Sequence, residues 1–414
     1  MAVNFAGRFG ALDKRVYILS LGWVVSSAGF AMVIPFLSIY FHEQLNLSMS
    51  AIGLFFGFTT VLRALPQPVS GWLSDRIGRV PIMGWSQILR SFTFAGVGYA
   101  IMTGSGFFVI AAFVSFNYIF GALLNPAANA MVADLVAKEQ RVSAYAMLRI
   151  GGNLGWALGP ALGGFVSDKS YSTLFYLAGF LMLISGIYFF YALRDVPRNN
   201  GRGGLADFKW GDIINIRQDP RLLRHCLISF VLFLVVAQLI AALSVYSVET
   251  VGISRAQLGT LYAINGFMVV FLQFPVSSLF KRVTLTGQLT VGAMIYAVGY
   301  FLVGLAPGFS FLILCMVVIT IAEMIISPPA LALVANLSPP DAYGRYMGIF
   351  GFFHMSGWSL GPTLGGFLLD VFATKPVLMW AIIAMLAVGA SILYRNFGRM
   401  LTPAQNSSRR AQVG

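Results

Sequence analysis

The chain has 414 residues, of which 58% are hydrophobic and only 10% are charged, and its formal net charge is +13 at pH 7. A soluble domain has about 25% charged residues, and a compact shape cannot hide this much apolar surface from water. The composition therefore excludes an ordinary soluble protein, the two cysteines argue against a disulfide scaffold, and a lipid bilayer is the expected surrounding.

The first apolar run follows a short basic start and continues to about Tyr40 without a small-residue cleavage pattern. It therefore predicts a retained membrane helix and not a signal peptide. In hydrocarbon the backbone must satisfy its own hydrogen bonds, so each later apolar run also predicts a helix, and each can cross about 30 Å of hydrocarbon. We predict twelve membrane helices at about 16–41, 51–73, 81–103, 106–132, 143–167, 171–193, 225–248, 256–280, 287–306, 309–335, 346–369 and 374–394.

The distribution of basic residues indicates the orientation. With a cytoplasmic N-terminus, 21 Lys and Arg residues fall on the cytoplasmic side, 3 on the outer side and 3 inside helices. Because basic residues are enriched in cytoplasmic loops, we expect a multi-pass protein of the cell membrane with both termini in the cytoplasm. The same bias accounts for the positive charge, so we expect no nucleic-acid partner.

Two segments of the chain are alike. RIGGNLGWALGPALGGFVSD ends at Asp168, and GFFHMSGWSLGPTLGGFLLD ends at Asp370, 202 residues later. Transporter folds are often built from such repeats, here related by an axis along the membrane normal, with a site between the halves and a rocking motion about it. The repeat predicts an N-terminal six-helix bundle at 1–193, a cytoplasmic linker at 194–224 and a C-terminal six-helix bundle with a short cytoplasmic tail at 225–414.

The short loop after the second span reads GWLSDRIGR, and it resembles the G-x-L-x-D-R-x-G-R signature of the major facilitator superfamily. The resemblance covers the whole chain and implies the major facilitator fold, an all-α membrane protein with two pseudo-symmetric six-helix bundles. In that family the acid at the position of Asp75 is thought to lock the halves together on the cytoplasmic face, where a helix N-terminus favours a carboxylate. The alternative is a turn that only fixes the topology. The expected cytoplasmic gate motif is Gly71, Asp75, Arg76, Gly78, Arg79 and Asp134.

The fifth span contains GWALGPALGG, which resembles a motif of the drug:proton antiporter branch of this family. The resemblance implies a seal between the halves on the outer side, and the alternative is ordinary close packing of helices through small residues. One departure is Asn117, four residues before Gly121, where many drug antiporters carry an arginine. The expected helix-packing residues are Gly155, Gly159, Pro160, Gly163 and Gly164.

Glu323 is the one acid predicted deep inside a span, about halfway along the tenth. A charge at mid-bilayer costs at least about 2.5–3.5 kcal/mol, so it needs a reason, and a carboxyl group there can take up a proton. The surrounding IAEMIISPP resembles the tenth helix of several multidrug exporters, which carry an acid there. Glu323 is therefore the candidate for proton coupling, and a permanent ion pair with a buried arginine is the alternative.

Other polar residues recur about four apart along the predicted helices and suggest faces that avoid lipid. Arg90 is set apart, because the third helix is expected at the periphery and this arginine to pack within its bundle. Several arginines and one acid favour an anionic or zwitterionic substrate, whereas drug exporters often carry lipophilic cations; the sequence leaves this open. The candidates for the substrate cavity are Arg63, Gln67, Asn117, Arg149, Asn153, Gln238, Tyr246, Asn265, His354 and Trp358.

The sequence contains no ATP-binding loop, metal cluster or nucleophile–base pair, so we expect no enzyme and no cofactor, with a proton gradient as the energy source. We predict a monomeric secondary active transporter that exports small organic or lipophilic compounds by proton antiport and alternating access. One alternative is a coupled or facilitative transporter of an organic anion, sugar or other metabolite. A more distant alternative is a receptor or scaffold that does not transport.

Overall fold

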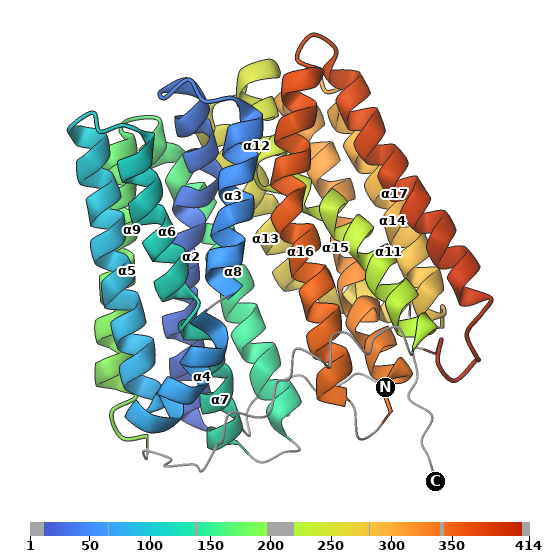
Figure 1. Ribbon diagram of the computed structural model, residues 1–414, viewed down its shortest axis with the longest axis horizontal. Helices are drawn as coiled ribbons and strands as arrows, with labels where there is room; N and C mark the ends of the chain where they lie inside the picture. Colours follow the sequence, from blue (N-terminus) through green and yellow to red (C-terminus); the bar gives the residue numbers. More distant parts are fainter. Residues whose placement is uncertain are drawn as a thin grey trace. The chain divides into compact units, whose positions relative to one another are not determined.

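The computed structural model describes residues 12–64, 66–136, 140–196, 219–280, 282–339 and 343–407. Figure 1 traces these parts in chain order, from blue to red. The chain forms two compact units. Unit 1 comprises Met1–Leu45, Phe58–Asp207 and Ser254–Val270, and unit 2 comprises Asn46–Gly57, Phe208–Ile253 and Phe271–Gly414. Each unit thus includes one short segment from the other half of the sequence. The predicted division into two bundles and a linker stays a prediction, since most of 194–224 lies outside the described residues.

The described residues form helices and no strand. Counting a broken helix as one span, they make the twelve predicted spans, and eight of these are long and apolar enough by themselves to cross a membrane. The helices are α2 (Lys14–Glu43), α3 (Met49–Ala64), α4 (Pro66–Ile77), α5 (Arg79–Met102), α6 (Phe107–Gly121), α7 (Leu124–Leu135), α8 (Arg141–Ser167), α9 (Tyr171–Ala192), α11 (Pro220–Val236), α12 (Ala242–Val245), α13 (Arg255–Leu279), α14 (Leu285–Val303), α15 (Phe309–Leu337), α16 (Tyr343–Val371) and α17 (Pro376–Gly398).

The fourth span is not the continuous helix that the sequence predicts. It is broken into α6 and α7 at residues 122–123. Pro126 explains the break, because proline lacks an N–H and its ring clashes with the carbonyl four residues earlier. Two carbonyls at the break accept hydroxyl hydrogen bonds instead, Phe120 from Ser86 at 2.9 Å and Leu123 from Ser70 at 2.7 Å. Hydroxyl groups of α4 and α5 thus donate hydrogen bonds to carbonyls at the point where the regular helical hydrogen bonds are interrupted.

The seventh span is also interrupted, against expectation. After α11 the chain forms a 3₁₀ turn at Ala237–Leu239, the short helix α12 and a π-helical turn at Tyr246–Thr250. The side-chain amide of Gln238 lies at this break and donates to the carbonyls of Leu234 and Gly361, both at 2.8 Å. Gln238 therefore joins α11 to α16 through the irregular turn; its NH2 group is satisfied by backbone carbonyls, whereas its buried Oε1 has no hydrogen-bond partner among the described residues.

The helix pairings within unit 1 recur within unit 2. In the first half α2 packs on α8 and α9, and α5 packs on α6 and α9. In the second half α11 packs on α16 and α17, and α14 packs on α15 and α17. These are the same four pairs, six spans later. The sequence repeat is therefore a repeat of packing.

Glycines of α8 allow α2 to approach at backbone distance. A Cβ atom added at Gly155, Gly159 or Gly163 would come within 2.7, 2.5 and 2.3 Å of carbonyl oxygens of α2. No side chain fits at these positions, so the antiporter-type stripe is a close-packing surface between two helices. Gly164 faces elsewhere, and its added Cβ would lie 2.4 Å from the carbonyl oxygen of Arg255, at the start of α13.

Candidate functional site

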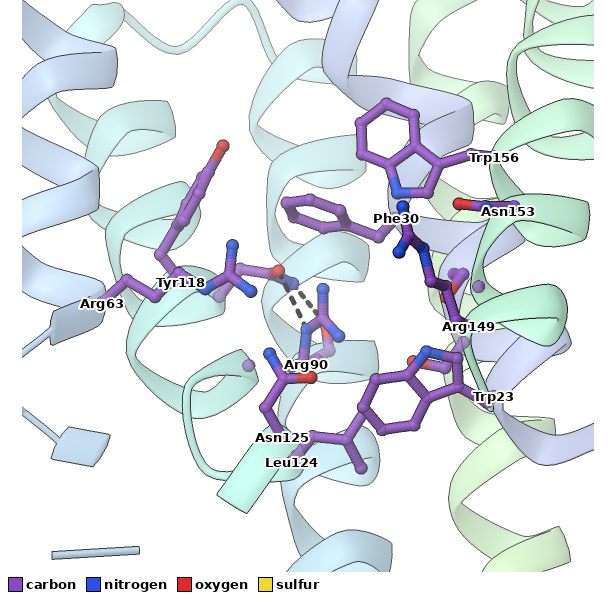
Figure 2. A pocket seen from close by; sticks show the side chains of 15 residues that line it. Trp23, Phe30, Arg63, Arg90, Tyr118, Leu124, Asn125, Arg149, Asn153 and Trp156 are labelled. Carbon is purple, nitrogen blue, oxygen red and sulfur yellow. Dashed lines mark hydrogen bonds between the residues drawn. The ribbon is translucent and has the colours of Figure 1, made fainter. Parts of the chain in front are cut away.

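Unit 1 contains a cavity of about 320 Å³. Its lining comes from α2, α3, α5, α6, α7 and α8, so it lies among helices and not in a surface loop. Figure 2 shows its side chains, several of them cationic, aromatic or amide groups. The lining residues are Trp23, Ser26, Ser27, Phe30, Arg63, Arg90, Asn117, Tyr118, Gly121, Leu124, Asn125, Arg149, Gly152, Asn153 and Trp156.

Arg90 of α5 is held in place by α6. Its Nε donates to Oδ1 of Asn117 at 3.2 Å, and the amide of Asn117 in turn donates to the carbonyl of Arg90 and to the hydroxyl of Thr93. Asn117 is 1% exposed. A Cβ at Gly121 would lie 3.1 Å from Nε of Arg90, so a small residue leaves room for the guanidinium. Both the oxygen and the nitrogen of the Asn117 amide thus form hydrogen bonds that orient the buried guanidinium of Arg90.

The guanidinium groups of Arg63 and Arg149 are not engaged in this way. In the described part of the chain, neither makes a hydrogen bond or an ion pair with another residue. In the view of Figure 2 they reach in from opposite sides, with Arg90 between them. The charges of Arg63 and Arg90 are close enough to act on each other. Two cations therefore face this cavity without a hydrogen bond to any other side chain or backbone group that the structure describes.

Aromatic side chains form another part of the wall. The ring of Phe30 meets Tyr118 edge to face at 5.5 Å and Trp156 at 6.4 Å, and Arg90 lies over the same ring at 4.9 Å. Edge-to-face aromatic pairs and a cation over a ring are both favourable arrangements. The cavity thus offers flat apolar surface beside its cations.

The ion pairs between described residues lie away from the cavity. They join Arg79 to Asp134, Arg194 to Asp195 and Arg255 to Glu43. No described lining residue is acidic, so the cavity is cationic. Among the described residues, no group of three or more His, Cys, Asp or Glu side chains is arranged to hold a metal ion.

The cavity brings together four residues predicted for it: Arg63, Asn117, Arg149 and Asn153. The side chain of Gln67 lies outside the described residues. Sequence reasoning separated Arg90 from the others, and the structure puts it in the same cavity. It also missed the lining residues of α2, Trp23 and Phe30 among them, which in the sequence are ordinary members of an apolar run.

The candidates from the second half lie outside this lining. Tyr246 is 3% exposed and packs against Trp380, with ring centroids 5.3 Å apart. The ring of His354 is 3.9 Å from that of Phe233. Gln238 bonds backbone carbonyls, as described above. Asn265 and Trp358 are partly buried. The assignment of these five residues to a substrate cavity stays a prediction.

Glu323 lies at the midpoint of α15, which runs from Phe309 to Leu337. Its side chain is partly buried in unit 2, close to the phenol of Tyr296 in α14. The carbonyl of Glu323 accepts a hydrogen bond from Ser327 at 2.9 Å. The position predicted for this acid, about halfway along its helix, is therefore confirmed, while its depth in the membrane and its role in coupling stay predictions.

Three residues of the predicted gate motif, Gly78, Arg79 and Asp134, lie together at the start of α5. Gly78 has a φ of 108°, which favours glycine, and it separates α4 from α5. Arg79 donates to Ser74 of α4 at 2.6 Å and pairs with Asp134 of α7 at 3.2 Å. Arg76 is exposed, and the side chain of Asp75 lies outside the described residues, so a lock through this acid stays a prediction.

The two repeats end in equivalent aspartates that cap helix N-termini. In unit 1, Asp168 accepts from the backbone N–H of Ala256 at the start of α13, at 3.3 Å. In unit 2, Asp370 accepts from the backbone N–H groups of Met49 and Ser50 at the start of α3, at 3.0 and 2.8 Å. A carboxylate is stabilised at such a site by free N–H groups and the helix dipole. The sequence repeat therefore extends to this contact.

The chain is similar to curated proteins over almost its whole length. It is 24% identical to an uncharacterised MFS-type transporter, YttB, of Bacillus subtilis (strain 168), over 97% of this chain and 100% of the relative. It is also 24% identical to the multidrug resistance protein MdtH of Salmonella arizonae (strain ATCC BAA-731 / CDC346-86 / RSK2980), over 94% of this chain and 96% of the relative.

Solved structures share the fold at low identity. A peptide transporter of the POT type has a TM-score of 0.76 at 14% identity, covering 94% of this chain and 96% of its own. A nucleoside transporter, NupG, has a TM-score of 0.75 at 13% identity, covering 94% and 100%. The family profile of the Major Facilitator Superfamily matches residues 19–362 and 226–412. The chain therefore belongs to the major facilitator superfamily, and it is a multi-pass secondary transporter and not an enzyme.

Proposed function

We propose that this transporter exports small organic compounds in exchange for protons, and that its substrate binds in the cavity of unit 1. The observation that carries the proposal is the cavity itself, a polar and aromatic space of about 320 Å³ among membrane helices. Its volume falls within the range of small-molecule sites, about 300–1,000 Å³. The similarity to MdtH proteins, named for multidrug resistance, supports efflux as the direction.

Glu323 is the proposed proton carrier. It is an acid at the middle of a membrane helix, where keeping a charge costs free energy and taking up a proton removes that cost. In the proposed cycle Glu323 takes a proton from the outside and releases it to the cytoplasm, while the substrate moves the other way. Alternating access would open the sites to one side at a time.

The test is uptake of fluorescent dyes, both cationic and anionic, into inside-out vesicles with an acidic interior. We expect the wild type to accumulate at least one dye and a protonophore to abolish the accumulation. Glu323→Gln should reduce it to the level of empty vesicles, because the amide cannot carry the proton. Asp195→Asn removes an acid whose side chain is 82% exposed, and it should transport like the wild type.

A second measurement separates loss of coupling from loss of folding. Glu323→Gln should still exchange labelled dye for unlabelled dye without a pH gradient, since the proposed site for the dye lies in unit 1. Dye uptake that ignores the pH gradient and survives Glu323→Gln would contradict proton antiport. It would favour the alternative, a facilitative transporter of an organic anion, sugar or other metabolite.

The proposal includes the surroundings of the protein. We propose a monomer in the cell membrane with both termini in the cytoplasm, without cofactor or nucleic-acid partner, with lipid and the small-molecule substrate as its only required partners. The basis is the distribution of basic residues along the sequence.

A further inference from the structure

We propose that the substrate of this cavity is an organic anion with a planar aromatic or otherwise flat apolar part, bound through Arg63 and Arg149. The inference rests on the proposed function, because it takes the cavity of unit 1 as the transport site. It goes further by fixing the sign of the charge that the site accepts.

The cavity lining carries a net positive charge. Three guanidinium groups line it, no described lining residue is acidic, and no described residue forms an ion pair with any of the three. Cations among membrane helices are costly, and like charges raise the cost further. A bound anion offsets both the cost of placing cations among membrane helices and the repulsion between these cations, whereas a bound cation increases the repulsion.

The three arginines of the lining differ in how they are held. Arg90 is fixed by Asn117 and by the ring of Phe30. Arg63 and Arg149 are free of described partners, and a guanidinium offers paired N–H donors that match a carboxylate, sulfonate or phosphate. Arg63 and Arg149 are therefore the groups that would bind the anion directly, while Arg90 stays bound to Asn117 and contributes its positive charge.

The remaining wall of the cavity is largely aromatic and amide surface. The rings of Phe30, Tyr118 and Trp156 form a connected aromatic cluster beside the arginines. Such surfaces bind flat apolar groups, while the amides of Asn125 and Asn153 offer both donors and acceptors. A small anion without an apolar part would leave this surface without a partner, so the site suits an amphipathic organic anion.

The experiment measures binding of two planar aromatic dyes of opposite charge, fluorescein as the anion and ethidium as the cation, to the purified full chain in detergent. Fluorescence anisotropy of each dye reports binding without need of a proton gradient. We expect fluorescein to bind and ethidium to bind at least tenfold more weakly or not at all. Arg63→Gln and Arg149→Gln should each weaken fluorescein binding by about tenfold or more, as loss of a charge-assisted hydrogen bond does.

Two further variants keep the result interpretable. Arg194→Gln removes an exposed arginine outside the cavity and should bind fluorescein like the wild type. Arg63→Lys and Arg149→Lys keep the charge, so each should recover part of the affinity lost in the Gln variant even if packing at the position is imperfect. Thermal unfolding of every variant shows whether it is folded.

The outcomes are distinct. Binding of ethidium but not fluorescein, or of neither dye, overturns the anion inference. Fluorescein binding that is unchanged in folded Arg63→Gln and Arg149→Gln overturns it as well. If cationic dyes are nevertheless exported under a proton gradient in vesicles, proton-coupled export survives and only the substrate class proposed here fails.

Discussion

At the scale of single residues, Asn117 makes three hydrogen bonds in the wall of the cavity. It accepts from Arg90 and donates to the carbonyl of Arg90 and to Thr93, at 1% exposure. We predict that Asn117→Ala lowers the free energy of unfolding by about 1–3 kcal/mol, because buried polar groups lose their partners. Asn129→Ala, an exposed asparagine of α7, is the matched control and should change it by less than about 0.5 kcal/mol. Equal stability of the two variants in thermal unfolding would refute this account.

Only some of the residues that line the cavity could be predicted from the sequence. Spacing of four along a helix grouped Arg149 with Asn153, and these two do share the cavity. Local spacing tells which residues of one helix share a face, but not which helices turn that face inward. For that reason the sequence set Arg90 aside and did not single out Phe30, although the two are in contact at 4.9 Å.

At the scale of helices, the close contact of α2 with α8 depends on glycines of α8, which have no side chain. A Cβ at Gly159 would lie 2.5 Å from the carbonyl oxygen of Ala28 and 2.9 Å from the nitrogen of Met32. Both are backbone atoms, so the helices would have to separate. We predict that Gly159→Ala lowers stability by about 1–3 kcal/mol or more, as overpacking does.

Gly389→Ala is the matched control for this prediction, because an added Cβ meets nothing within 4 Å in α17. Alanine is the better helix former by about 1 kcal/mol, so this control should be neutral or stabilising. Thermal unfolding of the two purified variants checks the difference. The prediction fails if Gly159→Ala is as stable as Gly389→Ala.

The helix-capping aspartates give a prediction in which each variant is the control of the other. Asp370→Ala removes acceptors from the first N–H groups of α3, and Asp168→Ala removes one from α13. Loss of a cap costs about 0.5–2 kcal/mol locally, which corresponds to roughly two- to thirtyfold faster amide exchange near the helix start. Hydrogen-exchange mass spectrometry should show faster exchange at 46–57 in Asp370→Ala only, and at 254–270 in Asp168→Ala only. Equal effects of both variants on both segments would contradict independent caps.

At the scale of the whole molecule, the apolar runs of the sequence predicted all twelve spans. In the described residues, however, only eight spans are long and apolar enough by themselves to cross a membrane. The four others are α3 with α4, α5, α8 and α16. Three of these four carry Arg63, Arg90 or Arg149, so the cationic side chains of the cavity come from spans that look least like membrane helices. The breaks in the fourth and seventh spans were not predicted, although Pro126 is a sequence signal for the first. Ser70 and Ser86 donate to carbonyls at the first break, and Gln238 at the second donates to a carbonyl of α16; local sequence does not reveal such contacts between helices.

The orientation in the membrane can be tested at the two ends of one helix. Lys169 and Asp195 flank α9, and both are exposed. The native cysteines, Cys226 and Cys315, are buried at 0% and 1% exposure, so the wild type should give little background labelling. We predict that Lys169→Cys reacts with a membrane-impermeant maleimide in intact cells, whereas Asp195→Cys reacts only after permeabilisation.

The physical reason is the cost of moving basic loops across the membrane. With a cytoplasmic N-terminus, 21 basic residues stay inside and 3 lie outside; the inverted orientation would exchange these numbers. Labelling of Asp195→Cys but not of Lys169→Cys in intact cells would invert the topology. It would also put the capping aspartates on the cytoplasmic side and the gate motif outside, and the direction of proton movement proposed for Glu323 would have to be reversed.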